Sequence, residues 1–248
     1  MKIIAVIPAR YKSSRFQGKP LADLLGKPML WWVYQKVKAA KGIDDIFVAT
    51  DNEIIENMCK KYGMNVIMTA DTHPTGVDRL SEVSHKVNAD FYLLVQGDEP
   101  LLETASIEDM VQKIRENPDK ECVRTFKTPL KNPVDAVNNT IIKIVTDLNN
   151  NILFASRSAI PYPKAAINFV YYKSVGIYAY PRDILLNYSK TIKGVLESAE
   201  DHDFMRMLEN GIKMKAYPRE TDTISVDTPK DLERVRKIME ERKNEINI

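Results

Sequence analysis

Cysteine and histidine are scarce in this sequence, and each shortage argues against a class of site. The chain has two cysteines and three histidines in 248 residues. Cys59 and Cys122 lie far apart and lack the spacing of a zinc site, and the histidines offer no zinc ligand pattern either. Free, unpaired thiols are typical of a reducing compartment, so we expect a cytoplasmic protein.

Long hydrophobic runs and an excess of one charge are also lacking. No apolar stretch approaches transmembrane length, and the amino end has no signal-peptide pattern. The 36 Lys and Arg residues nearly balance the 34 Asp and Glu residues, which leaves a formal net charge of +2. A dedicated nucleic-acid binder would show a basic excess. We therefore expect neither a membrane nor a nucleic-acid partner.

Glycine is missing where a common phosphate-binding motif would need it. Residues 2–9 read as a buried strand that ends in the loop 10–20. Gly18 is the only glycine before Gly26, so neither the P-loop nor the dinucleotide motif fits. The loop instead gathers cations and hydroxyls at the end of the strand: Arg10, Lys12, Ser13, Ser14, Arg15 and Lys19. This composition favours a triphosphate site over the alternative, a basic surface loop.

The elements expected up to residue 96 alternate between strand and helix. The apolar patterns predict strands and helices in turn over 2–9, 29–40, 45–51, 53–62, 65–68, 78–87 and 90–96. Short connections between them indicate a mostly parallel, doubly wound α/β sheet. Residues 123–180 are β-rich and predict a mixed or antiparallel extension, with a hairpin turn at 149–151. Helices are expected at 182–188, 196–209 and 229–244, with a strand at 213–217.

Two aspartates lie where a parallel sheet binds its ligands, beyond the carboxyl ends of its strands. Asp98 comes directly after the buried strand, and Asp227 comes before the last helix. Two carboxylates beside substrate phosphates suit Mg²⁺. Asp98 could instead shape a turn, and Asp227 could cap the helix that starts at Pro229. The pair, together with the cationic loop, favours the metal.

Several motifs in order resemble the CMP-Kdo synthetases, the family of 3-deoxy-manno-octulosonate cytidylyltransferases. The matching segments span essentially the whole chain and are 8–15, 18–21, 26–29, 48–51, 73–80, 95–100, 156–161, 176–178 and 226–233. The resemblance implies a Rossmann-like nucleotidyltransferase fold in one domain, 1–248. It also implies CTP as donor, Mg²⁺ as cofactor, an acidic sugar as acceptor for lipopolysaccharide or capsule biosynthesis, and a homodimer formed through the extension at about 123–180.

The resemblance also implies a role for each matching residue. Arg10, Ser13, Arg15 and Lys19 would bind the triphosphate; Thr75, Gly76, Arg79 and Gln96 would frame the cytidine; Asp98 and Asp227 would hold magnesium; Arg157 and Tyr178 would face the sugar. The implied reaction is in-line attack of the anomeric hydroxyl on the α-phosphorus, which needs positioning and charge neutralisation. Lys19, Asp98 and Asp227 are the expected catalytic residues.

The family pattern fails at two places, both in the acceptor half. Ser174 stands where the family usually has histidine, and His202-Asp203-Phe204 replaces Leu-Glu-Gln. Helical spacing predicts that Asp203 lies on the inward face of a helix and contacts the site, whereas His202 is expected to be exposed. We expect that CTP chemistry is kept and that the sugar acid is Kdo, an amino-substituted Kdo or another 2-keto-3-deoxy acid.

Two other readings stay open. A cytidylyltransferase for a sialic-type acid usually opens with a glycine-richer loop than residues 10–15 provide. A nucleotide-binding regulatory module without turnover could dispense with metal ligands, yet Asp98 and Asp227 are both present.

Overall fold

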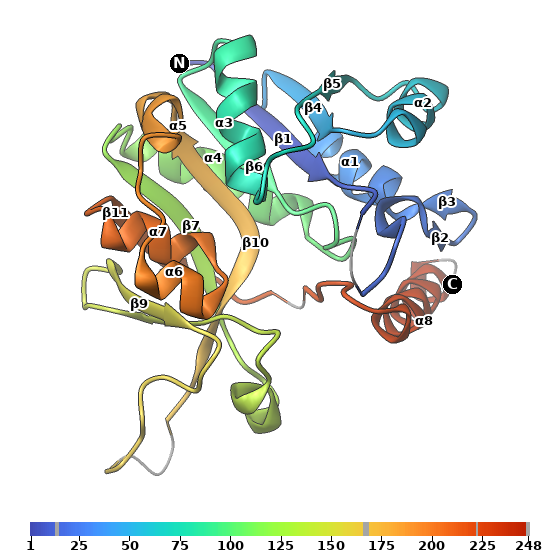
Figure 1. Ribbon diagram of the computed structural model, residues 1–248. Helices are drawn as coiled ribbons and strands as arrows, with labels where there is room; N and C mark the ends of the chain where they lie inside the picture. The colour runs from blue at the N-terminus through green and yellow to red at the C-terminus, as the bar shows by residue number, and fades with distance from the viewer. Residues whose placement is uncertain (13–14, 166–168, 222, 247–248) are drawn as a thin grey trace.

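The computed structural model describes residues 1–12, 15–165, 169–221 and 223–246. In this part of the chain nine strands form one sheet, in the order β11-β7-β10-β6-β1-β4-β5, with β8 attached to β10 and β9 to β8 (Figure 1). The strands are β1 (Ile3–Ala9), β4 (Asp45–Thr50), β5 (Val66–Met68), β6 (Phe91–Val95), β7 (Cys122–Pro129), β8 (Lys143–Thr146), β9 (Ile152–Ser156), β10 (Tyr172–Pro181) and β11 (Lys213–Pro218), beside a small pair, β2 (Asp23–Leu24) and β3 (Lys27–Pro28).

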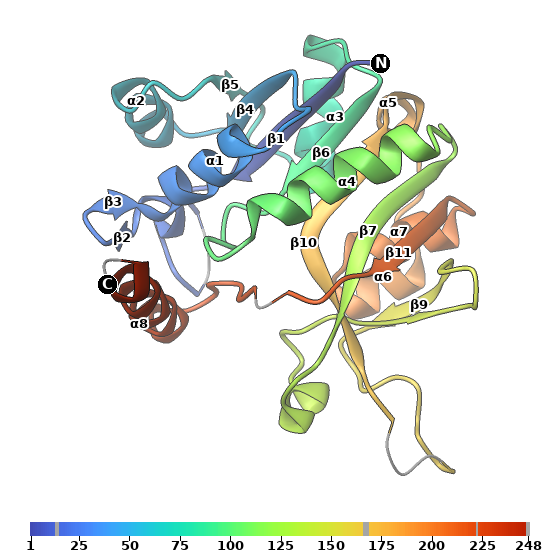
Figure 2. The same ribbon diagram turned by 180° about the vertical axis from the view of Figure 1, so that it is seen from behind.

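The helices lie on both faces of the sheet and beyond its edge (Figures 1 and 2). They are α1 (Met29–Ala39), α2 (Glu53–Lys61), α3 (Gly76–Lys86), α4 (Thr104–Glu116), α5 (Arg182–Tyr188), α6 (Val195–Glu200), α7 (Asp203–Glu209) and α8 (Pro229–Ile246), with short 3-10 helices at Lys19–Leu21 and Pro133–Val137. Among the described residues, no helix combines the length and hydrophobicity that a membrane crossing requires.

Strand direction divides the sheet into two parts. β1 runs parallel to both β4 and β6, and β5 runs parallel to β4. β10 is antiparallel to β6 and β7, while β11 is parallel to β7. The expected α/β class is confirmed, and the alternation of strands and helices up to β6 produces the parallel part.

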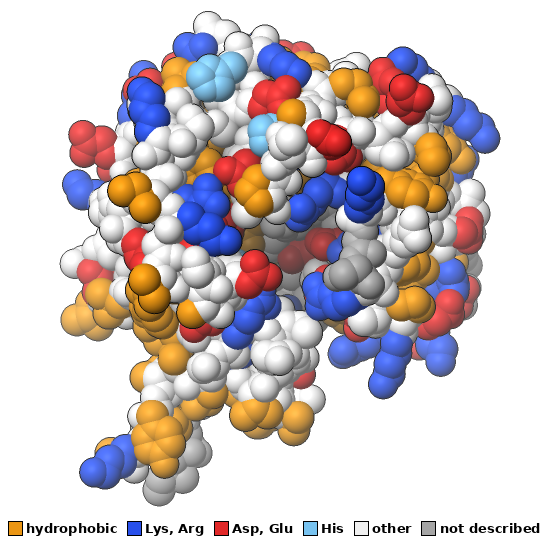
Figure 3. Space-filling model, viewed as in Figure 1, with side chains coloured by type: hydrophobic (Ala, Val, Ile, Leu, Met, Phe, Trp, Pro, Cys, Tyr) orange, Lys and Arg blue, Asp and Glu red, His pale blue; other side chains and the backbone are white. Residues whose placement is uncertain are grey.

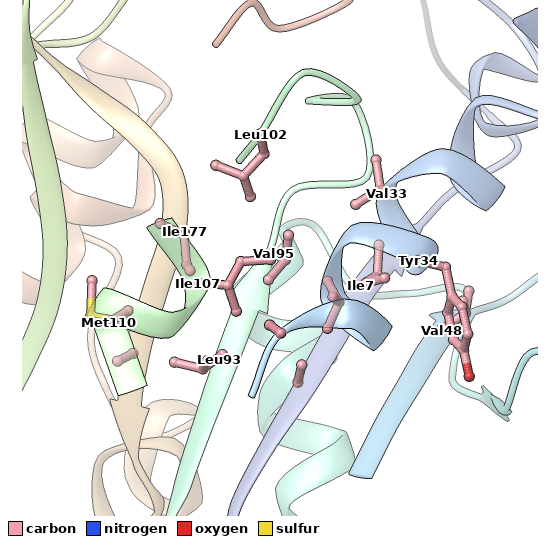
Figure 4. Packing of buried hydrophobic residues seen from close by; sticks show 14 of the residues in the cluster. Ile7, Val33, Tyr34, Val48, Leu93, Val95, Leu102, Ile107, Met110 and Ile177 are labelled. Atoms are coloured by element: carbon pink, nitrogen blue, oxygen red, sulfur yellow. The ribbon is translucent and has the colours of Figure 1, made fainter. Parts of the chain in front are cut away.

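The central strands are buried on both faces, so each strand contributes to two cores. Ile3, Ala5 and Ile7 of β1 pack in the cluster that includes side chains of α1 and α4 (Figures 2 and 4). Ile4 and Val6 point to the other face and pack in the cluster that includes side chains of α3, α5 and α7. Successive side chains of a strand point to opposite faces, which is why an unbroken apolar run suits this position.

Helix α3 begins two residues earlier than the expected start at Asp78. The Thr75 hydroxyl accepts a hydrogen bond from the Asp78 amide, and the Asp78 carboxylate accepts one from the Thr75 amide. This reciprocal capping box satisfies two donors that the first helical turn leaves free. It sets the start of α3, with Gly76 in its first turn, at the carboxyl-end edge of the sheet.

The β-rich segment 123–180 is less separate than expected. β7 and β10 are full members of the central sheet, and only the chain between them forms an arm that projects from it (Figure 1). In that arm β8 and β9 form the expected antiparallel hairpin, with Asn150 at a φ of 64° in its turn. Asparagine tolerates this left-handed conformation better than most residues.

Candidate active site

A cleft with a volume of about 760 Å³ opens at the carboxyl ends of β6 and β7. It is hollowed into the face shown in Figure 3, where acidic side chains lie inside and basic side chains lie around its rim. The residues that line it include predicted ones from both halves of the site: Arg15, Gln96, Asp98, Arg157, Ser174, Tyr178 and Asp227. The donor and acceptor halves thus share one cavity.

Lys19 joins the two predicted metal ligands. Its Nζ lies 2.6 Å from Oδ2 of Asp98 and 3.4 Å from Oδ1 of Asp227. All three side chains are largely buried, with 15%, 22% and 23% of their surfaces exposed. Arg15 adds a second cation, its Nη2 lying 3.0 Å from the same oxygen of Asp227. Residues far apart in the sequence therefore form one charged cluster.

Asp227 does not cap α8, so the helix-cap alternative for it is wrong. Thr228 and Asp231 make that cap: the Thr228 amide donates to Asp231 at 2.8 Å, and the Asp231 amide donates to the Thr228 hydroxyl at 3.3 Å. The carboxylate of Asp227 faces the cations instead. It is consequently available to a metal or to the groups that a metal brings.

The donor set fits a hard divalent cation. Asp98 and Asp227 each present a carboxylate oxygen to Lys19, and among the described residues no group of three or more Asp, Glu, His or Cys side chains could hold a metal by itself. Mg²⁺ binds through one or two carboxylates plus substrate phosphates rather than in a complete protein cage. The chemistry of these residues therefore suits a metal that arrives with a nucleotide.

In the predicted nucleotide half, contacts connect the cationic loop and the end of β1 to the start of α3. Nη1 of Arg10 donates to the carbonyl of Pro74 at 2.8 Å, which connects the cationic loop to the segment before α3. A Cβ on Gly76 would lie 3.4 Å from Cγ of Pro8, so the start of α3 packs closely on the end of β1. Gln96 lines the cleft. Ser13 lies outside the described residues.

Arg79 does not reach the cleft, contrary to its predicted contact with cytidine. Its side chain is fully buried, where it donates to Asp51 at 3.0 Å and to the Thr69 hydroxyl. The guanidinium therefore fastens α3 to the ends of β4 and β5.

Arg157 lines the acceptor half, and its guanidinium holds three backbone carbonyls. Nε donates to Glu200 at 2.7 Å, Nη2 to Asp201 at 3.0 Å and Nη1 to Asn139 at 3.0 Å. Lys143, which is fully buried, donates in turn to the carbonyl of Arg157. Burial lowers the pKa of Lys143. The cation in the acceptor half is thus rigidly placed.

Ser174 and Tyr178 lie on β10, and both line the cleft. Burial, followed by the nearby Glu99 carboxyl, raises the pKa of Tyr178, so its phenol stays protonated over the physiological range. Phe204 packs edge-on against the Tyr178 ring with centroids 5.3 Å apart. The Phe204 substitution, which removes an amide from the family pattern, therefore fills space behind a residue of the acceptor half.

The helix expected over 196–209 is broken into α6 and α7. Asp201 has a φ of 48°, and the ring nitrogen of His202 accepts a hydrogen bond from the Phe204 amide, so His202 is the N-cap of α7. The carbonyls of Glu200 and Asp201, which a continuous helix would use, accept from Arg157 instead. This tertiary competition could not be derived from helical spacing.

The break reverses the expectations for His202 and Asp203. His202 was expected to be exposed, but only 16% of its side chain is exposed and it lines the cleft; burial lowers its pKa. Asp203 is not among the described residues that line the cleft. Burial raises its pKa, and its charge acts on Tyr178 and Tyr180 behind the cleft wall. Of these two residues, it is His202 that lines the cleft.

Sequence reasoning also missed Glu99 and Lys143. Glu99 is buried in the cleft wall directly after Asp98, and Lys143 anchors Arg157. The available signals were a second acid after a buried strand and a lysine in an apolar run. Neither signal predicts which residue is contacted, because Thr223 and Arg157 lie more than ten residues from Glu99 and Lys143 in the chain.

Comparison with known proteins agrees with this geometry. A family model described as cytidylyltransferase matches residues 4–216. The chain belongs to the cytidylyltransferase family. It is 40% identical over 238 residues to the 3-deoxy-manno-octulosonate cytidylyltransferase of Escherichia coli, covering 96% of each chain. The enzyme of that name from Fusobacterium nucleatum is 40% identical over 236 residues, covering 95% of this chain and 96% of the relative. The predicted family resemblance is confirmed.

Solved structures of cytidylyltransferases and related enzymes share the fold. A CMP:2-keto-3-deoxy-manno-octonic acid synthetase complexed with CTP matches with a TM-score of 0.92 and 40% identity, over 98% of this chain and all of the other. A putative glucose-1-phosphate thymidylyltransferase from Bacillus anthracis matches with a TM-score of 0.69 at 17% identity, over 95% of this chain and 94% of the other. The second match supports the nucleotidyltransferase fold alone.

Proposed function

We propose that this protein transfers CMP from CTP to the anomeric hydroxyl of Kdo, or of a close 2-keto-3-deoxy sugar acid, and releases pyrophosphate. The observation that carries the proposal is that one cleft is lined by Asp98 and Asp227, both bonded to Lys19, together with Arg157 and the other acceptor-half residues. The identity to 3-deoxy-manno-octulosonate cytidylyltransferases over nearly the whole chain supports it.

The chain's own residues position the reactants and neutralise charge. Arg10, Arg15 and Lys19 bind the triphosphate, while Gly76 and Gln96 frame the cytidine. The acceptor oxygen attacks the α-phosphorus, the bond from that phosphorus to pyrophosphate breaks, and the hydroxyl proton is released. Lys19 stabilises the charge that develops on the phosphates, which requires no protein nucleophile.

The proposed cofactor is Mg²⁺, held by Asp98 and Asp227 together with the nucleotide phosphates. When bound it would neutralise phosphate charge and polarise the α-phosphate. The two aspartates hold the position, and Lys19 keeps their like charges together before the nucleotide arrives.

The acceptor half recognises an acid through Arg157 and Tyr178. Ser174, His202 and Phe204 depart from the family pattern there: Ser174 and His202 line the cleft, and Phe204 packs behind Tyr178. The proposed acceptor is therefore Kdo or a variant of it, including an amino-substituted Kdo. A sialic-type acid is the alternative outcome of the experiment below.

We further propose a cytoplasmic homodimer. The arm between β7 and β10 exposes large hydrophobic side chains, with Leu153 at 63%, Tyr162 at 85% and Val170 at 47% of their surfaces (Figure 3). Such a concentration of apolar surface on a projecting element is typical of a protein contact. A second copy of this chain would cover it.

An acceptor panel tests the proposed function. Pyrophosphate release from CTP is measured with Kdo, amino-substituted Kdo, a sialic-type acid and no acceptor. Release that depends on Kdo or amino-substituted Kdo is expected, and turnover with Kdo alone at ordinary efficiency would refute an altered acceptor. No release with any acid would instead favour a regulatory nucleotide-binding module.

A further inference from the structure

Glu99 is a buried carboxyl in the cleft wall that the reaction above does not use. It follows Asp98 directly in the chain, lines the same cavity, and only 8% of it is exposed. Burial raises its pKa, while the Thr223 hydroxyl and the Lys173 charge act in the opposite direction. An acid so placed needs a structural or functional reason, because burying a carboxyl costs free energy unless it is hydrogen-bonded.

The Glu99 carboxyl connects three segments that meet at the cleft. The Thr223 hydroxyl donates to its Oε2 at 2.6 Å, and the carboxyl lies against Gly176 of β10, where no side chain intervenes. Nζ of Lys173, also on β10, holds the Thr223 carbonyl at 2.8 Å. Glu99 thereby ties the end of β6 to β10 and to the segment that leads to Asp227.

That segment carries Asp227 back to Asp98. The Val226 amide donates to the backbone carbonyl of Asp98 at 2.8 Å, one residue before Asp227. Thr223 and Val226 are thus fastened to Glu99 and Asp98, two consecutive residues of one turn. The relative position of the two proposed metal ligands depends on both attachments.

Gly176 leaves the space that the Glu99 carboxyl occupies. A Cβ at position 176 would lie 2.3 Å from Oε1 of Glu99 and 2.5 Å from its Cδ. Such distances are far inside van der Waals contact, so any side chain at Gly176 must displace the carboxyl. Absence of a side chain, rather than an unusual backbone conformation, is what the position requires.

We propose that Glu99 is a positioning residue: seated against Gly176 and bonded to Thr223, it fixes Asp227 relative to Asp98 and thereby sets the geometry with which the two carboxylates bind a divalent cation and its nucleotide. The inference rests on the proposed function. It assigns Glu99 no contact with the reacting atoms. Groups that orient metal ligands typically change metal affinity about 10- to 100-fold when they are altered.

The test measures Mn²⁺ binding in the presence of CTP and without acceptor, by the electron paramagnetic resonance signal of free Mn²⁺. Gly176→Ala should weaken this binding about 10- to 100-fold. Adding Glu99→Asp, which shortens the acid by one methylene, should recover most of the loss in the Gly176→Ala chain. Wild-type binding by Gly176→Ala, or no recovery in the double variant, would overturn the proposal.

The chain contains a matched control for the steric clash. A Cβ at Gly194 would also lie 2.3 Å from a carboxyl, that of Glu209, which caps the start of α6 away from the metal ligands. Gly194→Ala should lower the midpoint of thermal unfolding but leave Mn²⁺ binding with CTP within about twofold of wild type. An equal loss of binding in both alanine variants would show a general effect of destabilisation and contradict the proposal.

A second pair covers the case in which Gly176→Ala fails to fold. Thr223→Val removes the hydroxyl that donates to Glu99 and keeps the shape of the side chain. Thr221→Val removes a buried hydroxyl that has no partner among the described residues. Only Thr223→Val should weaken Mn²⁺ binding with CTP; equal effects of the two would overturn the proposal. Failure of the proposed function would appear differently, as a wild-type protein that transfers no CMP.

Discussion

Lys19 offsets the negative charge of the two proposed metal ligands. Its Nζ contacts Asp98 and Asp227, and most of its side chain is buried. Lys19→Ala should lower kcat about 100-fold, because a preorganised cation acts mainly on charge that develops during the reaction. The KM for the acceptor should stay within a few-fold. Steady-state kinetics with both substrates varied would test this, and an effect confined to acceptor KM would contradict a phosphate role.

The two aspartates should be indispensable for turnover and dispensable for folding. Asp98→Asn or Asp227→Asn keeps the side-chain size but removes the charge that a divalent cation requires. We expect loss of measurable CMP transfer with a nearly unchanged thermal midpoint, and Asp45→Asn, at a surface pair with Lys2, as an active control. Near-normal activity in either site variant would remove that residue from the metal assignment.

The sequence predicted one site for Lys19, Asp98 and Asp227, because each follows or precedes a recognisable element, and the structure brings their side chains into contact. Sequence reasoning failed where a side chain's place depends on a distant partner. Arg79 and His202 were misplaced. Arg79 is enclosed by Asp51 and Thr69, and His202 caps a helix that the pattern does not separate. Neither the contacts of Arg79 nor the helix start at His202 can be predicted from the neighbouring sequence.

At the scale of elements, a buried ion-pair network joins α7, α6 and α3. Arg206 makes two hydrogen bonds of 2.6 Å to Glu197 and one of 3.1 Å to Asp78, the residue that completes the α3 capping box. Arg206→Met should lower the free energy of unfolding by about 3–5 kcal/mol, because it leaves Glu197 buried without its partner.

Urea unfolding with a matched surface variant tests the value of this network. Lys60→Met breaks the exposed pair with Glu56 and should cost less than about 1 kcal/mol. Equal costs for Arg206→Met and Lys60→Met would show that the buried network adds nothing to stability. Such a result would also remove the link from the acceptor-side helices to the start of α3.

The loop before α3 should make stability depend on acid pH. Burial acts to raise the pKa of Glu82, but hydrogen bonds from Lys86, His73 and the Ala70 amide outweigh it and lower the pKa to about 2. The folded pKa lies below the usual 4.5, so the carboxylate stabilises the fold above that value, and this contribution is lost as the pH falls toward about 2.

Glu82→Gln should therefore flatten this acid dependence. The free energy of unfolding measured from pH 7 to pH 2 should fall less steeply in Glu82→Gln than in wild type. Glu121→Gln, at a residue with 82% of its side chain exposed, should follow the wild-type curve. Parallel curves for wild type and Glu82→Gln would contradict the proposed anchoring of the loop.

At the scale of the whole molecule, the exposed arm should hold two copies together. Leu153→Asp places a charge on apolar surface that a second chain would bury, so sedimentation velocity should show a dimer for wild type and a monomer for the variant. Ile192→Asp, at an equally exposed residue beyond α5, is the matched control and should remain dimeric. A monomeric wild type would refute the dimer.

Much of the fold could be predicted because its parallel part repeats a local pattern. The apolar runs predict strands β1 and β6, and the helical periodicity predicts helices α1 and α3, each from its own segment alone. Long-range pairings could not be predicted in this way. The antiparallel placement of β10 between β6 and β7, and the break between α6 and α7, depend on contacts across the chain rather than within a segment.

Transfer of a labelled phosphate tests the proposed reaction most directly. CTP labelled at the α-phosphorus or at the γ-phosphorus is incubated with the protein, Mg²⁺ and the best acceptor of the panel. We predict that the α-label moves to the sugar acid as CMP and that the γ-label leaves in pyrophosphate. A γ-label on the sugar, or no acceptor-dependent movement of the α-label, would contradict a cytidylyl transfer site in this cleft.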